Sequence, residues 1–221
     1  MRVVTVNLYN GRVVPADLQR FLDEFEPDIL CGQEVGPEAA RVLDAHFAHG
    51  RLEPGLDFRG KAMVAQMPIT PVSIELAWRG GFRSVVSVDG REIDIVSAHL
   101  ANPIDGSTGV PVRRRQLDAL EPVLTSIEAG VVVGDMNATP VWPAYRRVRR
   151  WFDDGVADWA RRTGRRPART WAPYPDWPAL LRIDHVFTRG VELADVQVVP
   201  IAGLDHRAVV ADVSMSGGGW Q

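Results

Sequence analysis

Five largely apolar stretches of this sequence each adjoin a polar residue of a type that can bind a metal or move a proton. Four stretches run into such a residue and the fifth, residues 208–211, follows a pair; the residues are Asn7, Glu34, His99, Asp135 with Asn137, and Asp205 with His206. Singly, each has an ordinary structural explanation, because Asp and Asn commonly open turns. Strand ends meet at the rim of a sheet, so five together favour one shared site.

The oxygen ligands among these residues predict a hard metal ion. Glu34 and Asp205, assisted by Asn7, provide the one or two carboxylates through which Mg²⁺ typically binds while it keeps waters and takes phosphate oxygens as further ligands. The sequence has no cluster of cysteines or closely spaced histidines, which disfavours zinc. We therefore expect Mg²⁺ or Mn²⁺ as the cofactor and a phosphate ester as the substrate.

The other polar residues match the needs of phosphoryl transfer, which are an oriented water and compensation of the phosphate charge. Asp135 can accept the proton of the attacking water, and Asn137 can hold that water or a phosphate oxygen. His99 and His206 can donate to the phosphate, more strongly when protonated. Asp184, in Arg-Ile-Asp-His, can orient His206 by hydrogen bonding to its other ring nitrogen.

Helix and strand patterns alternate in the first part of the chain and supply the elements that position these residues. Pro15 opens a helical pattern that Pro27 ends, and further helices are predicted over residues 37–47 and 111–128. Strands are predicted over residues 2–7, 28–34, 61–66, 71–78, 82–89, 91–100, 130–135, 183–189, 191–199 and 207–214. The segment 142–182, rich in Arg, Trp and Pro, is predicted to be irregular.

This mixture predicts sheets covered by helices, in an α/β or α+β domain. The chain has 221 residues, of which 46% are hydrophobic, so it can bury a sizeable core. There is no internal repeat of fixed period and no linker pattern. We expect a single domain over residues 1–215 and a frayed tail over residues 216–221.

The order of the polar motifs resembles the endonuclease/exonuclease/phosphatase superfamily, which includes deoxyribonuclease I, inositol-polyphosphate phosphatases and neutral sphingomyelinases. The motifs are Asn7, Gln33-Glu34, Ala98-His99-Leu100, Gly134-Asp135-Met136-Asn137, Arg182-Ile183-Asp184-His185 and Asp205-His206, and they span nearly the whole chain. The resemblance implies a deoxyribonuclease I-like, four-layer αββα sandwich. Two mixed β-sheets would lie face to face with helices outside, and one site would lie at their common end.

The same resemblance implies a role for each motif residue. It places Glu34 and Asn7 at the metal, and it gives Asp205 either a metal ligand's role or a supporting one. It places Asp135 and Asn137 at the attacking water. The remaining roles are His99 and His206 at the phosphate and Asp184 as the support of His206.

Departures from the family patterns narrow the range of possible substrates. Abasic-site endonucleases usually have Trp before the first Asn and Lys soon after Gln-Glu, whereas this chain has Val6 and Val35-Gly36, which disfavours that activity. The frequent Ser-Arg-Tyr-Pro segment is replaced by residues 65–68, Ala-Gln-Met-Pro, so its arginine is missing. We expect Arg83 or the run 113–115, including Arg115, to supply substrate charge instead, and Trp171 to line the site wall.

Charge is distributed unevenly along the sequence. The formal net charge is −3, which argues against a protein coated with positive charge to grip duplex DNA. Residues 146–182 nevertheless contain ten arginines against four acidic residues, interleaved with tryptophans. This segment is either a surface for a phosphate-bearing substrate, with rings that stack on bases, or a solvated basic face with ordinary loop packing.

Three classes of function follow from these observations. The first is a phosphoesterase acting on a small or lipid-like phosphate ester, the second is a nuclease with the same chemistry, and the third is a non-catalytic scaffold of the same fold. A full set of site residues argues against the scaffold. The single cysteine, Cys31, excludes an intramolecular disulfide, and no apolar run is long enough to span a bilayer, so we expect a cytoplasmic protein without an evident protein partner.

Overall fold

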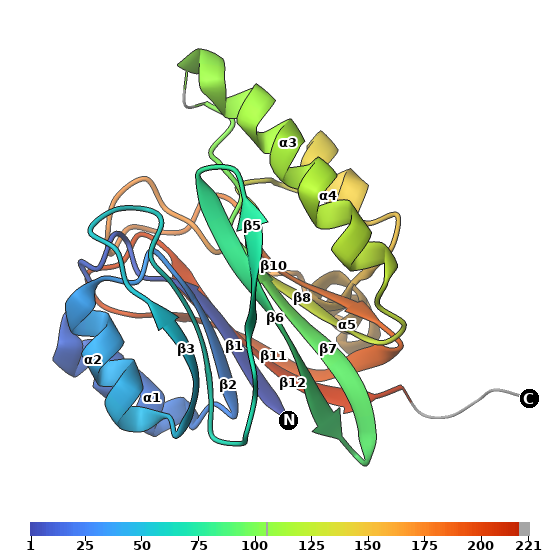
Figure 1. Cartoon of the computed structure of the whole chain (residues 1–221), viewed down its shortest axis with the longest axis horizontal. Helices are drawn as coiled ribbons and strands as arrows, with labels where there is room; N and C mark the ends of the chain where they lie inside the picture. The colour runs from blue at the N-terminus through green and yellow to red at the C-terminus, as the bar shows by residue number, and fades with distance from the viewer. Residues whose placement is uncertain (105, 217–221) are drawn as a thin grey trace, which may run out of the picture.

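The computed structural model describes residues 1–104 and 106–216, and its strands form two mixed six-stranded sheets (Figure 1). The first sheet has the order β11-β12-β1-β2-β4-β3, with β1 Arg2–Asn7, β2 Ile29–Gln33, β3 His49–Glu53, β4 Lys61–Ala65, β11 Val191–Pro200 and β12 Arg207–Met215. The second has the order β5-β6-β7-β8-β10-β9, with β5 Val72–Leu76, β6 Arg79–Val88, β7 Arg91–Ala98, β8 Gly130–Asp135, β9 Asp153–Asp154 and β10 Asp184–Arg189.

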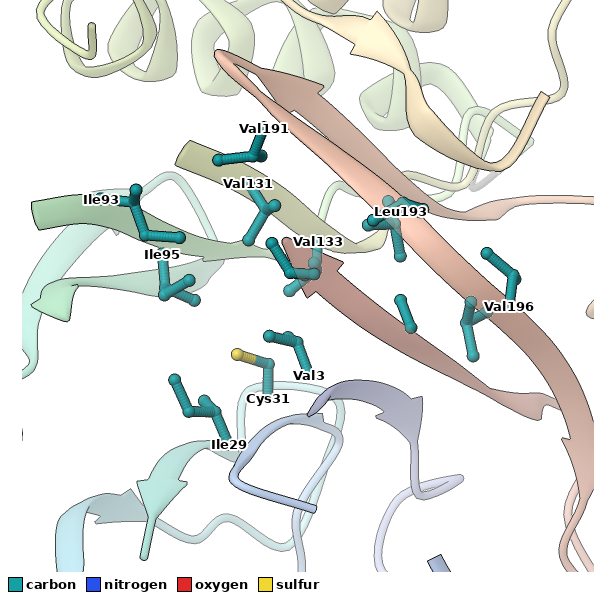
Figure 2. Packing of buried hydrophobic residues seen from close by; sticks show 14 of the residues in the cluster. Val3, Ile29, Cys31, Ile93, Ile95, Val131, Val133, Val191, Leu193 and Val196 are labelled. Carbon is teal, nitrogen blue, oxygen red and sulfur yellow. The ribbon is translucent and has the colours of Figure 1, made fainter. Parts of the chain in front are cut away.

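Continuous apolar runs let both faces of each sheet be buried. In β1, Val3 points into the core between the sheets, while Val4 packs outward against α1 (Pro15–Phe25) and α2 (Pro37–His46). In β8, Val131 lies in the same inter-sheet core, and Val132 packs outward with residues of α3 (Gly106–Thr125) and α4 (Pro143–Val148). Figure 2 shows the inter-sheet core. The four-layer sandwich implied by the family resemblance is therefore confirmed.

Strand direction brings the predicted site residues to one end of the sandwich. β2 runs parallel to β1, and β8 runs parallel to β7, so the carboxyl ends of each pair share an edge. β12 is antiparallel to β1, and β10 is antiparallel to β8, so these two strands begin where the others end. This end lies opposite the N-terminus (Figure 1).

The predicted strands are all present, but other elements differ from the expectation. The segment 142–182, predicted to be irregular, contains α4, β9 and α5 (Gly155–Thr163), and residues 49–53 form the additional strand β3. The predicted helix over 111–128 begins earlier, at Gly106, and ends at Thr125. Apart from Ser216, the predicted frayed tail lies outside the described residues. None of the described helices is both long and apolar enough to cross a membrane.

A buried ion pair organises the segment that looked irregular. Asp154 accepts hydrogen bonds from Arg182 at 2.6 and 3.0 Å, from the Tyr145 hydroxyl at 2.6 Å and from the backbone N–H of Ala157 at 3.0 Å, where it caps α5. Burial raises the pKa of Asp154, but its bonds to Arg182 outweigh burial and lower the pKa to about 2. One carboxylate thus joins α4, α5 and the chain entering β10.

We predict that Asp154→Ala lowers the free energy of unfolding by about 3 kcal/mol or more, because Arg182 is left as a buried unpaired charge. The neighbouring Asp153 is the matched control, since its exposed carboxylate pairs with Arg149. Asp153→Ala should change stability by less than about 0.5 kcal/mol. Urea unfolding measures both, and equal losses would contradict the assignment.

The same variant has a predicted pH dependence. The folded-state pKa of Asp154 is lowered from its ordinary value of 3.8 to about 2, so its contribution to stability is present above pH 4 and disappears as the pH falls toward 2. The stability difference between the parent and Asp154→Ala should narrow across that range. A difference that is constant from pH 6 to pH 2 would contradict the role of the ionised carboxylate.

Candidate active site

A cavity of about 790 Å³ lies where the strand ends converge. The predicted residues that line it are Asn7, Glu34, Asp135, Asn137, Trp171, Asp205 and His206. Two further predicted residues, His99 and Asp184, lie behind this surface in contact with those that line it. The structure therefore brings together nine of the eleven residues that the sequence indicated.

Asp135 is the centre of this arrangement. Its Oδ2 accepts hydrogen bonds from Asn7 Nδ2 at 3.1 Å and Asn137 Nδ2 at 3.2 Å, and its Oδ1 accepts from the backbone N–H of Asn137 at 2.8 Å. The Nε2 atoms of His99 and His206 lie 3.4 and 3.8 Å from Oδ2. Burial raises the pKa of Asp135, but the charge of His206 and the hydrogen bond with His99 hold it well below its usual range. The carboxylate is therefore ionised.

His206 is held by Asp184. Both carboxylate oxygens of Asp184 lie near His206 Nδ1, at 2.9 and 3.1 Å, and Thr170 fixes Asp184 by accepting its backbone N–H at 3.1 Å. Asp184 is in register with Asp135 on the neighbouring strand, so the imidazole lies between two carboxylates. Burial lowers the pKa of His206, but the two carboxylates raise it to about 10. His206 is therefore a charged donor that lines the cavity, with its Nε2 3.8 Å from Asp135 Oδ2.

His99 has the opposite protonation. Arg79, at the start of β6, contacts both nitrogens of the His99 ring, lies 3.6 Å from Glu34 Oε1, and stacks over Phe58 at 4.5 Å. Burial lowers the pKa of His99, and the positive charge of Arg79 lowers it further, so the ring is neutral. The positive charge on this side of the cavity belongs to Arg79, which the sequence reasoning missed because a lone Arg beside a hairpin turn is usually a surface residue.

The predicted metal ligands have free oxygen positions at the cavity wall. Oδ1 of Asp205 is buried without a hydrogen-bond partner among the described residues, and burial raises the pKa of that carboxyl. Glu34 accepts one hydrogen bond from the backbone N–H of Asn10 at 2.9 Å and keeps its other oxygen toward the cavity side chains. Both polar atoms of the Asn7 side chain are already hydrogen-bonded. Its Oδ1 accepts from the Tyr9 N–H at 2.9 Å, and its Nδ2 donates to Asp135.

A second set of possible ligand atoms comprises Asp135, Asp184 and His206, which lie within 4.8 Å of one another. In this set Asp184 is hydrogen-bonded to His206 through both oxygens, and the raised pKa of His206 keeps a proton on each ring nitrogen. A protonated imidazole cannot ligate a metal. Glu34 and Asp205 are therefore the better match to a hard cation.

Arg113 and Gln116 of α3 fix the loops that carry the site. Buried Arg113 donates to the carbonyls of Ala101 at 3.1 Å, Met136 at 2.9 Å and Asn137 at 2.7 Å. Gln116 donates to the carbonyl of Ala77 and accepts the Ala101 N–H, both at 2.7 Å. One turn of helix thus links the segments that follow β5, β7 and β8.

Backbone strain gathers at the same place. Of the eight non-glycine residues with positive φ among those described, five line the cavity, and these are Tyr9, Asn10, Glu34, Trp78 and Asn137. Such conformations cost free energy and persist where the surroundings enforce them, frequently at ligand sites.

The sequence matches a model of the endonuclease/exonuclease/phosphatase family over residues 4–206. The chain belongs to this family. The predicted resemblance is thus confirmed, and the residues on which it rested lie together at the site just described. No curated protein sequence matches the chain significantly.

Solved structures with the same fold are distant in sequence. The 3′-5′ exonuclease NExo from Neisseria meningitidis has a TM-score of 0.73 and 19% identity, with 97% of this chain and 100% of that one covered. D. rerio TDP2, complexed with single-strand DNA product, has a TM-score of 0.70 and 15% identity, with coverages of 97% and 99%. The human Nocturnin catalytic domain, with bound sulfate, has a TM-score of 0.70 and 16% identity, with coverages of 98% and 94%.

Two predicted residues of this family member do not reach the cavity. Arg83 lies on β6, where it pairs with Asp94 at 2.6 Å and donates to the Ser126 hydroxyl at 3.0 Å. Arg115 is exposed on α3, because the inward helix positions are taken by Arg113 and Gln116. The substrate charge expected from Arg83 or Arg115 therefore has to come from elsewhere, and Arg79 is the arginine at the cavity.

We predict that Asp184 acts through His206. Asp184→Asn should lower turnover by roughly 100-fold, similar to the loss of one transition-state donor, and His206→Ala should be comparably inactive. Because the two act as one unit, the double variant should be little worse than His206→Ala. Mg²⁺ affinity, measured by calorimetry, should change little in Asp184→Asn. Multiplicative losses, or a large loss of metal affinity, would show that Asp184 has an independent role.

We also predict that Arg113→Met lowers kcat by about tenfold or more and reduces stability, because three buried carbonyls lose their donor at about 1–3 kcal/mol each. Arg113→Lys should restore little, since one ammonium cannot reproduce a planar guanidinium that spans three acceptors. Arg114, exposed on the same helix, provides the control Arg114→Met, for which parental kcat and stability are expected. Parental kcat in Arg113→Met would contradict the positioning role.

Proposed function

We propose that this chain hydrolyses phosphate esters with Mg²⁺ or Mn²⁺ held by Glu34 and Asp205, with Asn7 assisting. The observation that carries the proposal is the buried Asp205 oxygen at the cavity wall, which has no hydrogen-bond partner among the described residues. A buried unpaired carboxylate oxygen is costly unless a cation satisfies it. Glu34 lines the same cavity, and its negative charge contributes to the raised pKa of Asp205.

A bound Mg²⁺ or Mn²⁺ would supply positive charge to the phosphate oxygens and so stabilise the charge that develops there. The protein residues supply the rest. The ionised Asp135 orients a water and takes its proton as the water oxygen bonds to phosphorus. The bond from phosphorus to the ester oxygen breaks, and the departing alkoxide takes a proton from solvent. Asn137 holds the water or a phosphate oxygen. His206, charged and fixed by Asp184, donates Nε2–H to the phosphate.

The lowered pKa of Asp135 makes its carboxylate better suited to holding the water than to removing a proton from it. A carboxylate with such a low pKa is a weak base, because efficient general bases have pKa values near the operating pH. Asp135 therefore contributes mainly by holding the water through its charge.

Cleavage of DNA or RNA by the same site is the alternative function. The solved relatives with this fold include a protein described as an exonuclease and another complexed with single-strand DNA product. Polynucleotide binding should weaken steeply with salt, because several phosphates release counterions on binding, whereas binding of a small ester should weaken little. A salt titration of affinity therefore separates the two functions. A non-catalytic scaffold would not require the complete set of site residues present here.

We predict that EDTA abolishes hydrolysis and that Mg²⁺ or Mn²⁺ restores it. Glu34→Gln should lower activity and raise the Mg²⁺ concentration for half-maximal rate by at least about tenfold, since a carboxylate ligand loses its charge. Glu38→Gln is the control, because Glu38 is exposed on α2 and pairs with Arg41. Full hydrolysis by chelator-treated protein would overturn the metal assignment.

A further inference from the structure

Trp78 has a backbone conformation that is unfavourable for a residue with a large side chain. It is the second residue of the two-residue turn between β5 and β6, and its φ is 67°, a conformation that favours Gly or Asn. The residue is 59% exposed and lines the cavity. Neither burial nor turn geometry explains a tryptophan here, so a ligand contact is the remaining use for the ring.

Other aromatic rings line the remaining walls. Tyr9 and Phe58 come from loops of the first sheet, Trp142 precedes α4, and Trp171 forms an isolated β-bridge with His206. The rings that line the cavity thus come from several separate segments of the chain. A cavity of about 790 Å³ with apolar walls and a few convergent polar groups is typical of a site for a small molecule.

The charges around the cavity do not suit a polynucleotide. Among the described lining residues Arg79 is the only Arg or Lys, and its guanidinium already contacts His99, lies near Glu34 and stacks on Phe58. A groove for single-stranded nucleic acid needs positive charge along the backbone path as well as stacking rings. This cavity provides the stacking rings, but it has positive charge from Arg or Lys at one point, Arg79.

The arginine-rich segment does not supply the missing charge. None of its arginines lines the cavity, and several pair within the protein, namely Arg147 with Asp118 and Glu121, Arg149 with Asp153, Arg161 with Asp158, and Arg182 with Asp154. The charges of these four arginines, out of ten in the segment, are therefore balanced locally.

We propose that the substrate is a small phosphodiester in which the group that stays on the phosphate after cleavage is flat and aromatic, such as an aryl or a nucleobase, and stacks on Trp78. This inference rests on the proposed phosphoesterase function and adds the chemistry of the group attached to the phosphate. The phosphate lies at Glu34, Asp205 and His206, and the flat group lies toward the β5–β6 turn.

A matched pair of esters tests the inference. Methyl p-nitrophenyl phosphate and phenyl p-nitrophenyl phosphate release the same leaving group, so the ratio of their kcat/KM values isolates recognition of the second group. With Mg²⁺ or Mn²⁺ the protein should prefer the phenyl ester by roughly tenfold, within the range of one stacking contact. Octyl p-nitrophenyl phosphate, an apolar ester without a ring, should not share this preference.

The variants identify the residue responsible. Trp78→Gly should reduce the preference to about one and leave the thermal midpoint unchanged or raised, because Gly adopts positive φ without strain. Trp78→Phe should keep most of the preference. Trp151→Ala, at an exposed tryptophan outside the cavity lining, should keep the parental ratio.

Four results would overturn the inference alone. Equal kcat/KM for the methyl and phenyl esters, or a preference unaffected by Trp78→Gly, would exclude stacking at this turn. A stronger preference for the octyl ester would indicate a lipid-like substrate. Micromolar inhibition by a ten-nucleotide single strand, with steep salt dependence, would indicate a nuclease. Hydrolysis of neither ester with either metal would instead overturn the proposed function, and the inference with it.

Discussion

The Asp135 carboxylate is a buried negative charge, and a buried charge is tolerated only when donors and opposite charges surround it. Asn7, Asn137, His99 and His206 meet this requirement, and they come from the ends of four different strands or the loops beside them. The raised pKa of His206 is the reciprocal of the lowered pKa of Asp135, since each ion favours the other. The remaining features of the site follow from enclosing this charge.

The loops that enclose the Asp135 carboxylate must keep fixed positions. Buried side chains behind the cavity hold these loops by hydrogen bonds to their backbone. Arg113 holds three carbonyls, and Thr170 accepts the N–H groups of Ile183 and Asp184. These contacts also sustain the positive φ of Asn137. Preorganised groups of this kind need no reorganisation when charge develops on a substrate. The two histidines differ in charge because Asp184 supports His206, whereas Arg79 faces His99.

The sequence predicted the sandwich and the motif residues because apolar periodicity and strand-terminal polar residues are local signals. It missed α4, α5 and β9, since their stability depends on Asp154 and Arg182, which are 28 residues apart. Arg79 was missed, and Arg113, expected with the run 113–115 to supply substrate charge, instead holds three backbone carbonyls. Both roles lie in contacts that no local pattern encodes. Arg83 was expected at the site, but it is drawn to Asp94 on the neighbouring strand. The spacing of residues along the sequence does not show which charged side chains pair over long distances, and these pairs account for the differences.

The position of β12 has a consequence for when activity can arise. This strand, late in the chain, lies between β11 and β1, and His206 directly precedes it, while Asn7 ends the first strand. The two ends of the fold are therefore adjacent at the site, and closing that contact is a long-range and slow event. A nascent chain that has exposed its first five motifs would hold no working centre. Hydrolysis would begin only when the final strand inserts, so a partly made molecule could not act on cellular phosphate esters.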